Sequence, residues 1–296
     1  MDKGQKHHFI PEFYLKQWGN PGDNGCLVEF CRRYKDVEAR PTFAGGTGYV
    51  RGLYSFNDLD IEVRNLIENE FLKQADDKAA LALQHLVVHN VDLKIDLKNA
   101  WSRFIMTLLF RNPEAIERLK KKVADGLPAV LQSLKLDWKA ARRQGDPQSL
   151  EEFSISIPKR DLQQAQLMFV RRMMDNESIG NFLNNMVWGV MTFHRPRYPL
   201  LISDRPYIMT DGLNKPGGHI MLPISSSTVF IAAYDKETIE KIDAACKRED
   251  LRMNEKMNKT IVSQARKFVW ANDKSQINLV AKYLGKQQRS TPFEWA

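Results

Sequence analysis

The sequence predicts an α+β protein that is mostly helical and contains one small antiparallel sheet. Apolar side chains recur every three or four residues through much of segment 58–190, which is the spacing of buried helix faces. In segment 190–235, short extended runs are joined by connections too short for crossover helices, which favours antiparallel pairing. The helical pattern returns over residues 236–284. We expect a single two-lobed domain over residues 1–296, because single cores stop growing at roughly 250–300 residues.

The segment 6–18 is expected to dock against the core. Its apolar and aromatic side chains present too much surface to be left in water: Phe9, Ile10, Phe13, Tyr14, Leu15 and Trp18. Pro11 suits the first position of a helix, where its missing N–H costs nothing. A helix over residues 11–18 would hold His8 just ahead of its positive end, a natural place for an anion or a reactive group.

A hairpin and a glycine-rich loop are predicted next. Turn formers fill residues 19–25, and residues 26–31 have the composition of a strand. Glycines interrupt residues 40–56, where aromatic side chains, Tyr54 among them, are expected to pin the loop. The glycines match neither the nucleotide-binding nor the dinucleotide-binding loop pattern, which argues against a phosphate loop.

Two long helices are predicted over residues 58–90 and 97–123. Glu70 lies within the apolar stripe of the first helix, where an ionised carboxylate needs a partner. Arg111 and Asn112 lie on the buried face of the second helix, directly before a proline that breaks it. An arginine and an amide are therefore expected on a buried face at a helix break.

The rest of the chain alternates helices with short strands. Helices are predicted over residues 161–175 and 178–190. Extended runs are predicted at residues 191–193, 199–203, 207–209, 219–222 and 228–233. Asp204 lies in the turn after the second of these runs. A helix near residues 251–270 places Asn254 and Asn258 on its apolar face, where side-chain amides need partners.

The composition is that of an ordinary globular protein, with 43% hydrophobic and 27% charged residues. The net charge of +8 is compatible with nucleic acid or a nucleotide as partner, although many basic proteins bind neither. No apolar run approaches the ~18–20 residues of a membrane span, so no membrane association is expected. The first residues lack the apolar core of a signal peptide, and the three cysteines form no CxxC pair. A cytoplasmic location is the expectation.

Several short motifs occur in an order that resembles one bacterial family. His8-Phe9-Ile10-Pro11, followed by Phe13-Tyr14-Leu15 and Trp18, resembles the opening signature of the family called domain of unknown function 4238. Further pieces follow in the family's order: Gly52-Leu53-Tyr54, the helix with Glu70, Arg111-Asn112-Pro113, Ile202-Ser203-Asp204-Arg205-Pro206, Leu222-Pro223-Ile224-Ser225 and the helix with Asn254 and Asn258. The chain departs from the family at Arg205, where the family most often has asparagine. The resemblance implies an α+β protein of bacterial type and supplies no established reaction.

The polar residues that periodicity places on buried faces are largely those of these motifs. We hypothesise that they gather in one pocket. The candidate catalytic residues are His8, Glu70, Arg111 and Asp204, and the candidate substrate-binding residues are Tyr14, Tyr54, Asn112, Asn254 and Asn258. His8 would act as general base or metal ligand, and Arg111 as a bidentate clamp for a phosphate or carboxylate. Asp204 and Glu70 would act either as carboxylate ligands of the metal or as the group that orients His8. This set fits a hydrolase assisted by a divalent metal, either a nuclease or a nucleotide phosphodiesterase, in a defence or toxin-like setting.

A structural role for the same residues is the alternative. Glu70 and Arg111 would form a buried ion pair, the two asparagines of the last helix would satisfy backbone groups, and Asp204 would stabilise its turn. The corresponding alternative function is a non-enzymatic binding or regulatory protein that recognises an anionic ligand or a partner.

Overall fold

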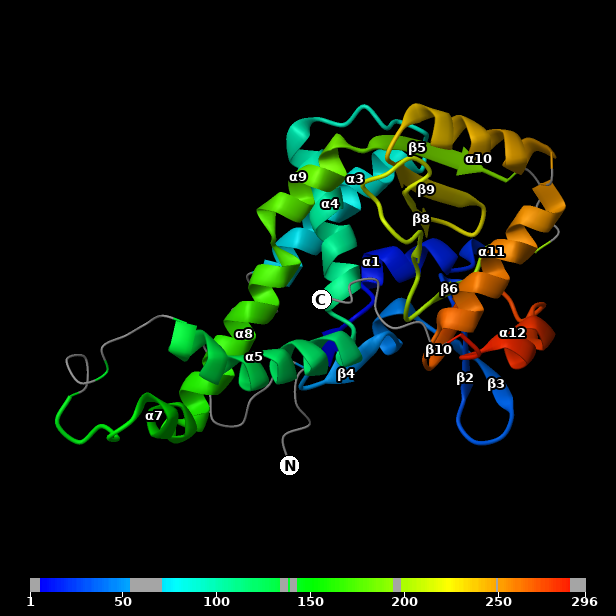
Figure 1. Ribbon diagram of the computed structural model, residues 1–296. Helices are drawn as coiled ribbons and strands as arrows, with labels where there is room; N and C mark the ends of the chain where they lie inside the picture. The colour runs from blue at the N-terminus through cyan, green and yellow to red at the C-terminus, as the bar shows by residue number, and fades with distance from the viewer. Residues whose placement is uncertain are drawn as a thin grey trace.

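A computed structural model of the chain describes residues 6–53, 71–133, 138, 143–193, 198–248 and 250–287 (Figure 1). Helices predominate in these residues and the strands pair antiparallel, which confirms the predicted α+β class. The prediction of one small sheet needs correction, because the described strands form two four-stranded sheets and one two-stranded sheet. The difference arises because the N-terminal hairpin pairs with a strand near residue 270.

The N-terminal segment forms the predicted short helix and docks in the core. Its elements are β1 (Lys6–His8), α1 (Glu12–Leu15), the 3-10 helices η1 (Lys16–Trp18), η2 (Pro21–Asp23) and η3 (Ala44–Gly46), and β4 (Tyr49–Arg51). β1 pairs with β4, and the chain turns into α1 at Pro11. Tyr14, Leu15 and Trp18 are fully buried, so the expected docking is confirmed. This docking fixes His8 at the end of β1.

One four-stranded sheet joins segments that lie far apart in the sequence. Its strands, in spatial order, are β3 (Val37–Thr42), β2 (Leu27–Arg32), β10 (Phe268–Ala271) and β6 (Ile202–Ser203). The helix predicted over residues 251–270 is therefore too long: α11 (Asp250–Gln264) ends and β10 follows. Pairing with β2 and β6 decides the strand conformation of residues 268–271, whose aromatic and β-branched side chains suit a strand.

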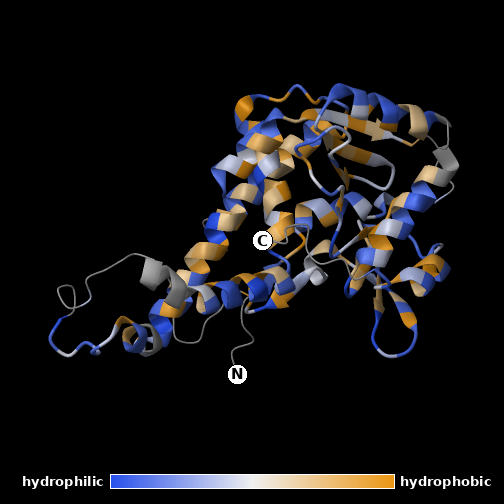
Figure 2. Cartoon of the chain, viewed as in Figure 1, coloured by the Kyte–Doolittle hydropathy of each residue, from blue (hydrophilic) through white to orange (hydrophobic). Residues whose placement is uncertain are grey.

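The second four-stranded sheet lies beneath α10 (Lys236–Arg248). Its strands, in spatial order, are β5 (Val187–Thr192), β9 (Thr228–Ala233), β8 (His219–Pro223) and β7 (Ile208–Met209). Its strands are mainly hydrophobic, whereas α10, which contacts β5 and β9, is mainly hydrophilic (Figure 2). The helix predicted over residues 178–190 is also too long, because α9 (Glu177–Asn185) ends where β5 begins to pair with β9.

The helices between residues 73 and 185 pack on one another. They are α3 (Lys73–Leu86), α4 (Ile95–Phe110), α5 (Pro113–Ser133), α7 (Leu150–Ser156), α8 (Lys159–Met174) and α9. The predicted break at Pro113 is confirmed and separates α4 from α5. Of the helix predicted over residues 58–90, residues 58–70 lie outside the described part of the chain. α5 and α8 run side by side away from the sheets (Figure 1).

The main hydrophobic core holds the N-terminal segment against α4 and the second sheet. The ring centroid of Phe104 lies 4.9 Å from that of Trp101 and 5.4 Å from that of Tyr14, and Trp101 also contacts Phe230 at 5.6 Å. α12 (Ile277–Tyr283) packs separately against α11 and β3. None of the helices in the described ranges is long and apolar enough to cross a membrane.

Candidate functional site

A cavity of about 410 Å³ lies between the N-terminal segment and α3. Its wall is rich in ionisable side chains: His8, Glu12 and Lys16 from the N-terminal segment, and Lys73, Asp76 and Asp77 from α3. Pro11, Phe13, Leu72 and Ala80 complete the lining. A volume of this size is typical of small-molecule sites, and the charged lining would select polar ligands.

His8 is held at this cavity by the strand and turn around it. Its backbone pairs with Tyr49 across β1 and β4, and the two rings lie edge to face with centroids 5.5 Å apart. Its Nε2 atom lies 3.6 Å from Oε1 of Glu12, one helical turn later. The side chain is 16% exposed, and Nε2 has no hydrogen-bond partner within the described residues. His8 is therefore fixed in position but keeps one unused ring nitrogen.

The surroundings of His8 favour its neutral form. Burial is the main cause that lowers its pKa from the ordinary value of 6.5. Glu12 opposes this effect by raising the pKa, whereas the positive charges of Arg111 and Lys6 lower it further. A neutral imidazole at pH 7 can accept a proton or a hydrogen bond.

Arg111 lies behind the cavity wall, fully buried at the C-terminal end of α4. Its Nη1 atom lies 3.2 Å from both carboxylate oxygens of Asp76 on α3. Its Nε and Nη2 atoms are buried and have no hydrogen-bond partner among the described residues. These two nitrogens form one edge of the planar guanidinium, the edge that binds a carboxylate or phosphate through two parallel hydrogen bonds.

Asp76 lies between Arg111 and the cavity, because it forms an ion pair with the arginine and also lines the cavity. It is half-buried and lines the cavity, and burial raises its pKa while the charge of Arg111 and its hydrogen bonds oppose that shift. Sequence reasoning missed this residue, although it lies one position after Ala75 and three before Ala79 on the buried face of α3. The feature of the sequence that could have identified Asp76 is a carboxylate at the flank of an apolar stripe. The ion pair predicted between Glu70 and Arg111 is not described, because Glu70 and Tyr54 both lie outside the described residues.

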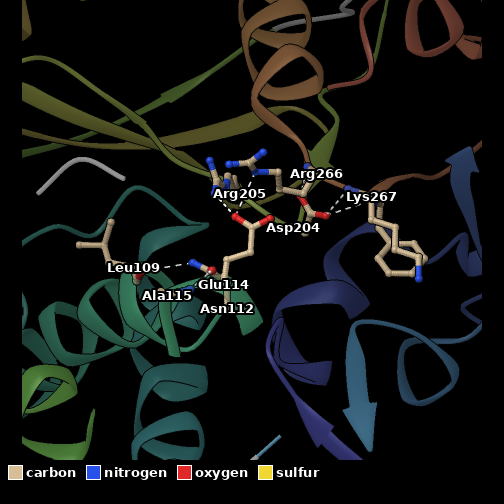
Figure 3. Close-up of polar contacts among 9 residues, drawn as sticks. Leu109, Asn112, Glu114, Ala115, Asp204, Arg205, Arg266 and Lys267 are labelled. Atoms are coloured by element: carbon tan, nitrogen blue, oxygen red, sulfur yellow. Dashed lines mark hydrogen bonds and ion pairs between the residues drawn. The ribbon is translucent and has the colours of Figure 1, made fainter. Parts of the chain in front are cut away.

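Asn112 caps the helix that follows the break. Its Oδ1 accepts a hydrogen bond from the backbone N–H of Ala115 at 2.9 Å, and its Nδ2 donates to the carbonyl of Leu109 at 3.3 Å (Figure 3). The amide therefore satisfies backbone groups at the junction of α4 and α5.

Asp204 accepts three backbone hydrogen bonds at the entry to β10. Oδ1 accepts from the N–H of Arg266 at 2.8 Å, and Oδ2 accepts from Lys267 at 2.7 Å and Phe268 at 3.0 Å (Figure 3). Burial raises the pKa of Asp204, and these backbone hydrogen bonds oppose the shift. Both oxygens are thus engaged in holding a turn, and Asp204 does not line the cavity.

The other predicted binding residues also bond to backbone groups. Asn258 accepts from the N–H of Leu201 at 2.9 Å and donates to the carbonyl of Pro199 at 2.8 Å. Asn254 donates to the carbonyl of Tyr198 at 3.3 Å. The hydroxyl of Tyr14 donates to the carbonyl of Pro223. Of the predicted site residues that are described, the structure brings only His8 and Arg111 to the same cavity region.

A metal site is not evident in the ranges that the structure describes. Within them, no three histidine, cysteine, aspartate or glutamate side chains are grouped so that they could hold an ion. The two candidate ligands lie in different parts of the fold, His8 at the cavity and Asp204 in the turn that binds the backbone before β10. Any metal-assisted step remains a prediction.

A family model described as protein of unknown function, DUF4238, matches residues 6–275. The chain belongs to this family. The matched span contains every element that forms the cavity of this DUF4238 protein. Searches among curated proteins and among solved structures find no match.

Arg205, in the turn after β6 of this DUF4238 protein, forms an ion pair with a glutamate. Its Nη2 lies 2.6 Å from Oε2 of Glu114 at the start of α5, and Nε of Arg266 lies 3.0 Å from the same oxygen (Figure 3). The arginine side chain is only 6% exposed. This side chain therefore links the turn after β6 to α5 rather than recharging an open pocket.

Proposed function

We propose that this DUF4238 protein binds a small anionic ligand at the cavity beside His8, with Arg111 as the principal anchor. The observation that carries the proposal is the unpaired Nε and Nη2 edge of a fully buried guanidinium. A buried donor without an acceptor costs about 1–3 kcal/mol, and more when it is charged. A ligand with two coplanar oxygens would remove this cost.

The charges around the unpaired edge of the Arg111 guanidinium indicate which class of ligand would bind there. A phosphate or carboxylate matches the spacing of the two unpaired nitrogens. Glu12, Asp76 and Asp77 line the same cavity as Lys16 and Lys73, so the rest of the ligand should be neutral or cationic rather than polyanionic. Because Arg111 is fully buried, an entering anion must displace part of the wall, and half-buried Asp76 is the group that competes for the guanidinium.

Binding can be tested by isothermal titration calorimetry with phosphate, acetate and adenosine monophosphate. We expect Arg111→Lys to weaken binding at least tenfold, because an ammonium group cannot present two parallel donors. Arg205→Lys is the matched control, since it alters a second buried arginine away from the cavity. Equal affinity in the wild type and in Arg111→Lys would contradict the proposal.

Hydrolysis of a phosphoester is a second candidate, favoured by the neutral state of His8. A neutral imidazole 3.6 Å from Glu12 could take a proton from water while Arg111 holds the phosphate. A nucleotide phosphodiester is the proposed substrate class, because the carboxylates of the cavity disfavour a polyanion such as nucleic acid, and a divalent metal would assist the reaction. Release of nitrophenol from bis(4-nitrophenyl) phosphate, with and without Mg²⁺, Mn²⁺ or Zn²⁺, measures this activity. His8→Gln should abolish it while leaving phosphate binding largely intact.

A further inference from the structure

Three lysines converge on one tyrosine at the end of α12. The Nζ atoms of Lys259, Lys282 and Lys286 lie 4.8, 5.3 and 5.9 Å from the ring centroid of Tyr283. The lysines are exposed and the tyrosine is half-buried. A hydrogen bond from Lys282 is the main cause that lowers the pKa of Tyr283, and the charge of Lys259 adds to it. This end of the molecule therefore concentrates positive charge around an accessible aromatic ring.

The backbone holds this arrangement in place. The segment after α12 returns along α11 through a hydrogen bond from the N–H of Gln287 to the carbonyl of Ser263 at 2.9 Å. Gly285 makes the return possible with a φ of +74°, a conformation that favours glycine. Nη2 of Arg32, at the end of β2, donates to the carbonyl of Ala281 at 2.8 Å and brings a fourth cation to α12.

The tip of the β2–β3 hairpin extends the same basic surface. Arg32 is followed by Arg33, Tyr34 and Lys35, and the side chain of Tyr34 is 89% exposed. α12 packs against β3, so the hairpin and α12 are neighbours (Figure 1). Glu38 partly offsets the charge, at 3.7 Å from Arg33. We call these residues the α12 surface: Arg32, Arg33, Tyr34, Lys35, Lys259, Lys282, Tyr283 and Lys286.

The lysines around Tyr283 differ from those of α10. On α10 each of three lysines forms an ion pair within the helix: Lys236 with Glu240 at 3.5 Å, Lys241 with Glu237 at 2.6 Å and Lys247 with Asp243 at 2.6 Å. Within the described residues, none of the three lysines around Tyr283 has a carboxylate partner. Like charges that gather without counter-charges repel one another, and a bound polyanion would remove that repulsion.

We propose that the α12 surface binds single-stranded nucleic acid. The lysines and arginines would neutralise successive phosphates, and Tyr34 and Tyr283 would each stack on a base. An anionic membrane fits less well, because membrane-surface helices need an exposed apolar face. Among the large hydrophobic side chains that are exposed in the described part of the chain, Tyr34 alone belongs to this surface. The surface shares no residue with the cavity, so this inference does not depend on the proposed ligand.

Fluorescence anisotropy with a labelled 20-nucleotide oligothymidine tests the proposal. The triple variant K259A/K282A/K286A should bind at least tenfold more weakly at 50 mM salt. Its slope of log K against log salt should fall by about 2, at roughly 0.7 for each lost phosphate contact. The control K236A/K241A/K247A removes the same number of positive charges and should stay within about twofold of the wild type. Tyr283→Ala should weaken binding about fivefold or more, whereas Tyr283→Phe should retain it.

Several results would overturn the proposal. Equal weakening by both triple variants would mean that only net charge matters, and no weakening by the first would remove the site. Loss of binding to phosphatidylglycerol vesicles with unchanged oligothymidine binding would assign the surface to membranes instead. An unchanged affinity in Tyr283→Ala would remove the stacking that distinguishes nucleic acid from other polyanions. Circular dichroism melting curves confirm that each variant compared is folded.

Discussion

Arg111 and Asp76 join two helices through one guanidinium nitrogen, since Nη1 lies 3.2 Å from both oxygens of the carboxylate. The pair connects the end of α4 to the first turn of α3, and Asp76 also lines the cavity. One interaction therefore braces the helices and controls access to the remaining edge of Arg111. Substitutions here should affect stability and ligand binding in different ways.

Asp76→Asn should destabilise the protein by about 2–3 kcal/mol. The change leaves a fully buried guanidinium without its counter-charge, which is the costly way to break a buried ion pair. Urea denaturation measures the loss. Asp77→Asn is the control, because Asp77 is exposed on the same helix and should change stability by at most about 0.5 kcal/mol. The ion pair would have no structural role if the two variants were equally stable.

His8 should make the protein less stable in mild acid. The pKa of His8 is lower in the folded protein than in the unfolded chain, so the unfolded chain binds more protons in mild acid. Neutral His8 therefore makes its full contribution to the free energy of unfolding above pH 6.5, and this contribution is lost as the pH falls below that value. His7, which is buried, has a lowered pKa for the same main reason and acts in the same direction.

The measurement is urea denaturation between pH 7.5 and pH 5 in the wild type and His8→Asn. The variant should lose less stability over this interval, because it cannot bind the extra proton when it unfolds. His85→Asn, an exposed position, serves as the control and should follow the wild type. Parallel curves for His8→Asn and the wild type would contradict the prediction.

Asp204→Asn should weaken the entry to β10. An amide can accept through only one of its two terminal atoms, so it cannot replace both oxygens that bind Arg266, Lys267 and Phe268. We expect a loss of about 2–3 kcal/mol, because hydrogen bonds to a buried charge are worth about 1.5–3 kcal/mol. Faster hydrogen exchange at these three amides would locate the effect. Asp211→Asn, in an exposed loop, should leave both stability and exchange unchanged.

Glu114→Gln should loosen the contact between α5 and the turn after β6. The change removes the charge shared by Arg205, at 2.6 Å, and Arg266, at 3.0 Å. A loss of about 1–3 kcal/mol is expected, since the hydrogen bond between Glu114 and the buried Arg205 is charge-assisted. Glu117→Gln is the matched control on the same helix, where the side chain is 71% exposed. Identical melting temperatures for the two variants would show that the Glu114 contacts contribute nothing.

The sequence allowed the local features of the fold to be predicted. The aromatic content of residues 9–18 correctly indicated a docked segment, and Pro113 correctly marked a helix break. Two helices were predicted too long because apolar runs at 187–190 and 268–270 suit a helix or a strand equally well. Both segments are strands because they pair with strands that are distant in the sequence, and the local pattern of residues cannot predict that pairing.

The candidate site was predictable only in part for the same reason. Periodicity correctly placed Asn254 and Asn258 inside, where both are fully buried. It could not show that their partners would be backbone groups at residues 198–201, more than fifty positions earlier. Asp76 was missed because a carboxylate at the edge of an apolar stripe usually faces solvent, and only its position opposite Arg111 gives it a partner.

The central position of β10 in its sheet affects how the chain folds while it is being synthesised. Residues 27–42 leave the ribosome well before residues 268–271, since translation proceeds at roughly 5–20 residues per second. Until β10 emerges, the hairpin has an open edge that can pair with other nascent chains. Truncation before residue 268 would make that exposure permanent, so shortened forms of this protein should accumulate as aggregates rather than as stable fragments.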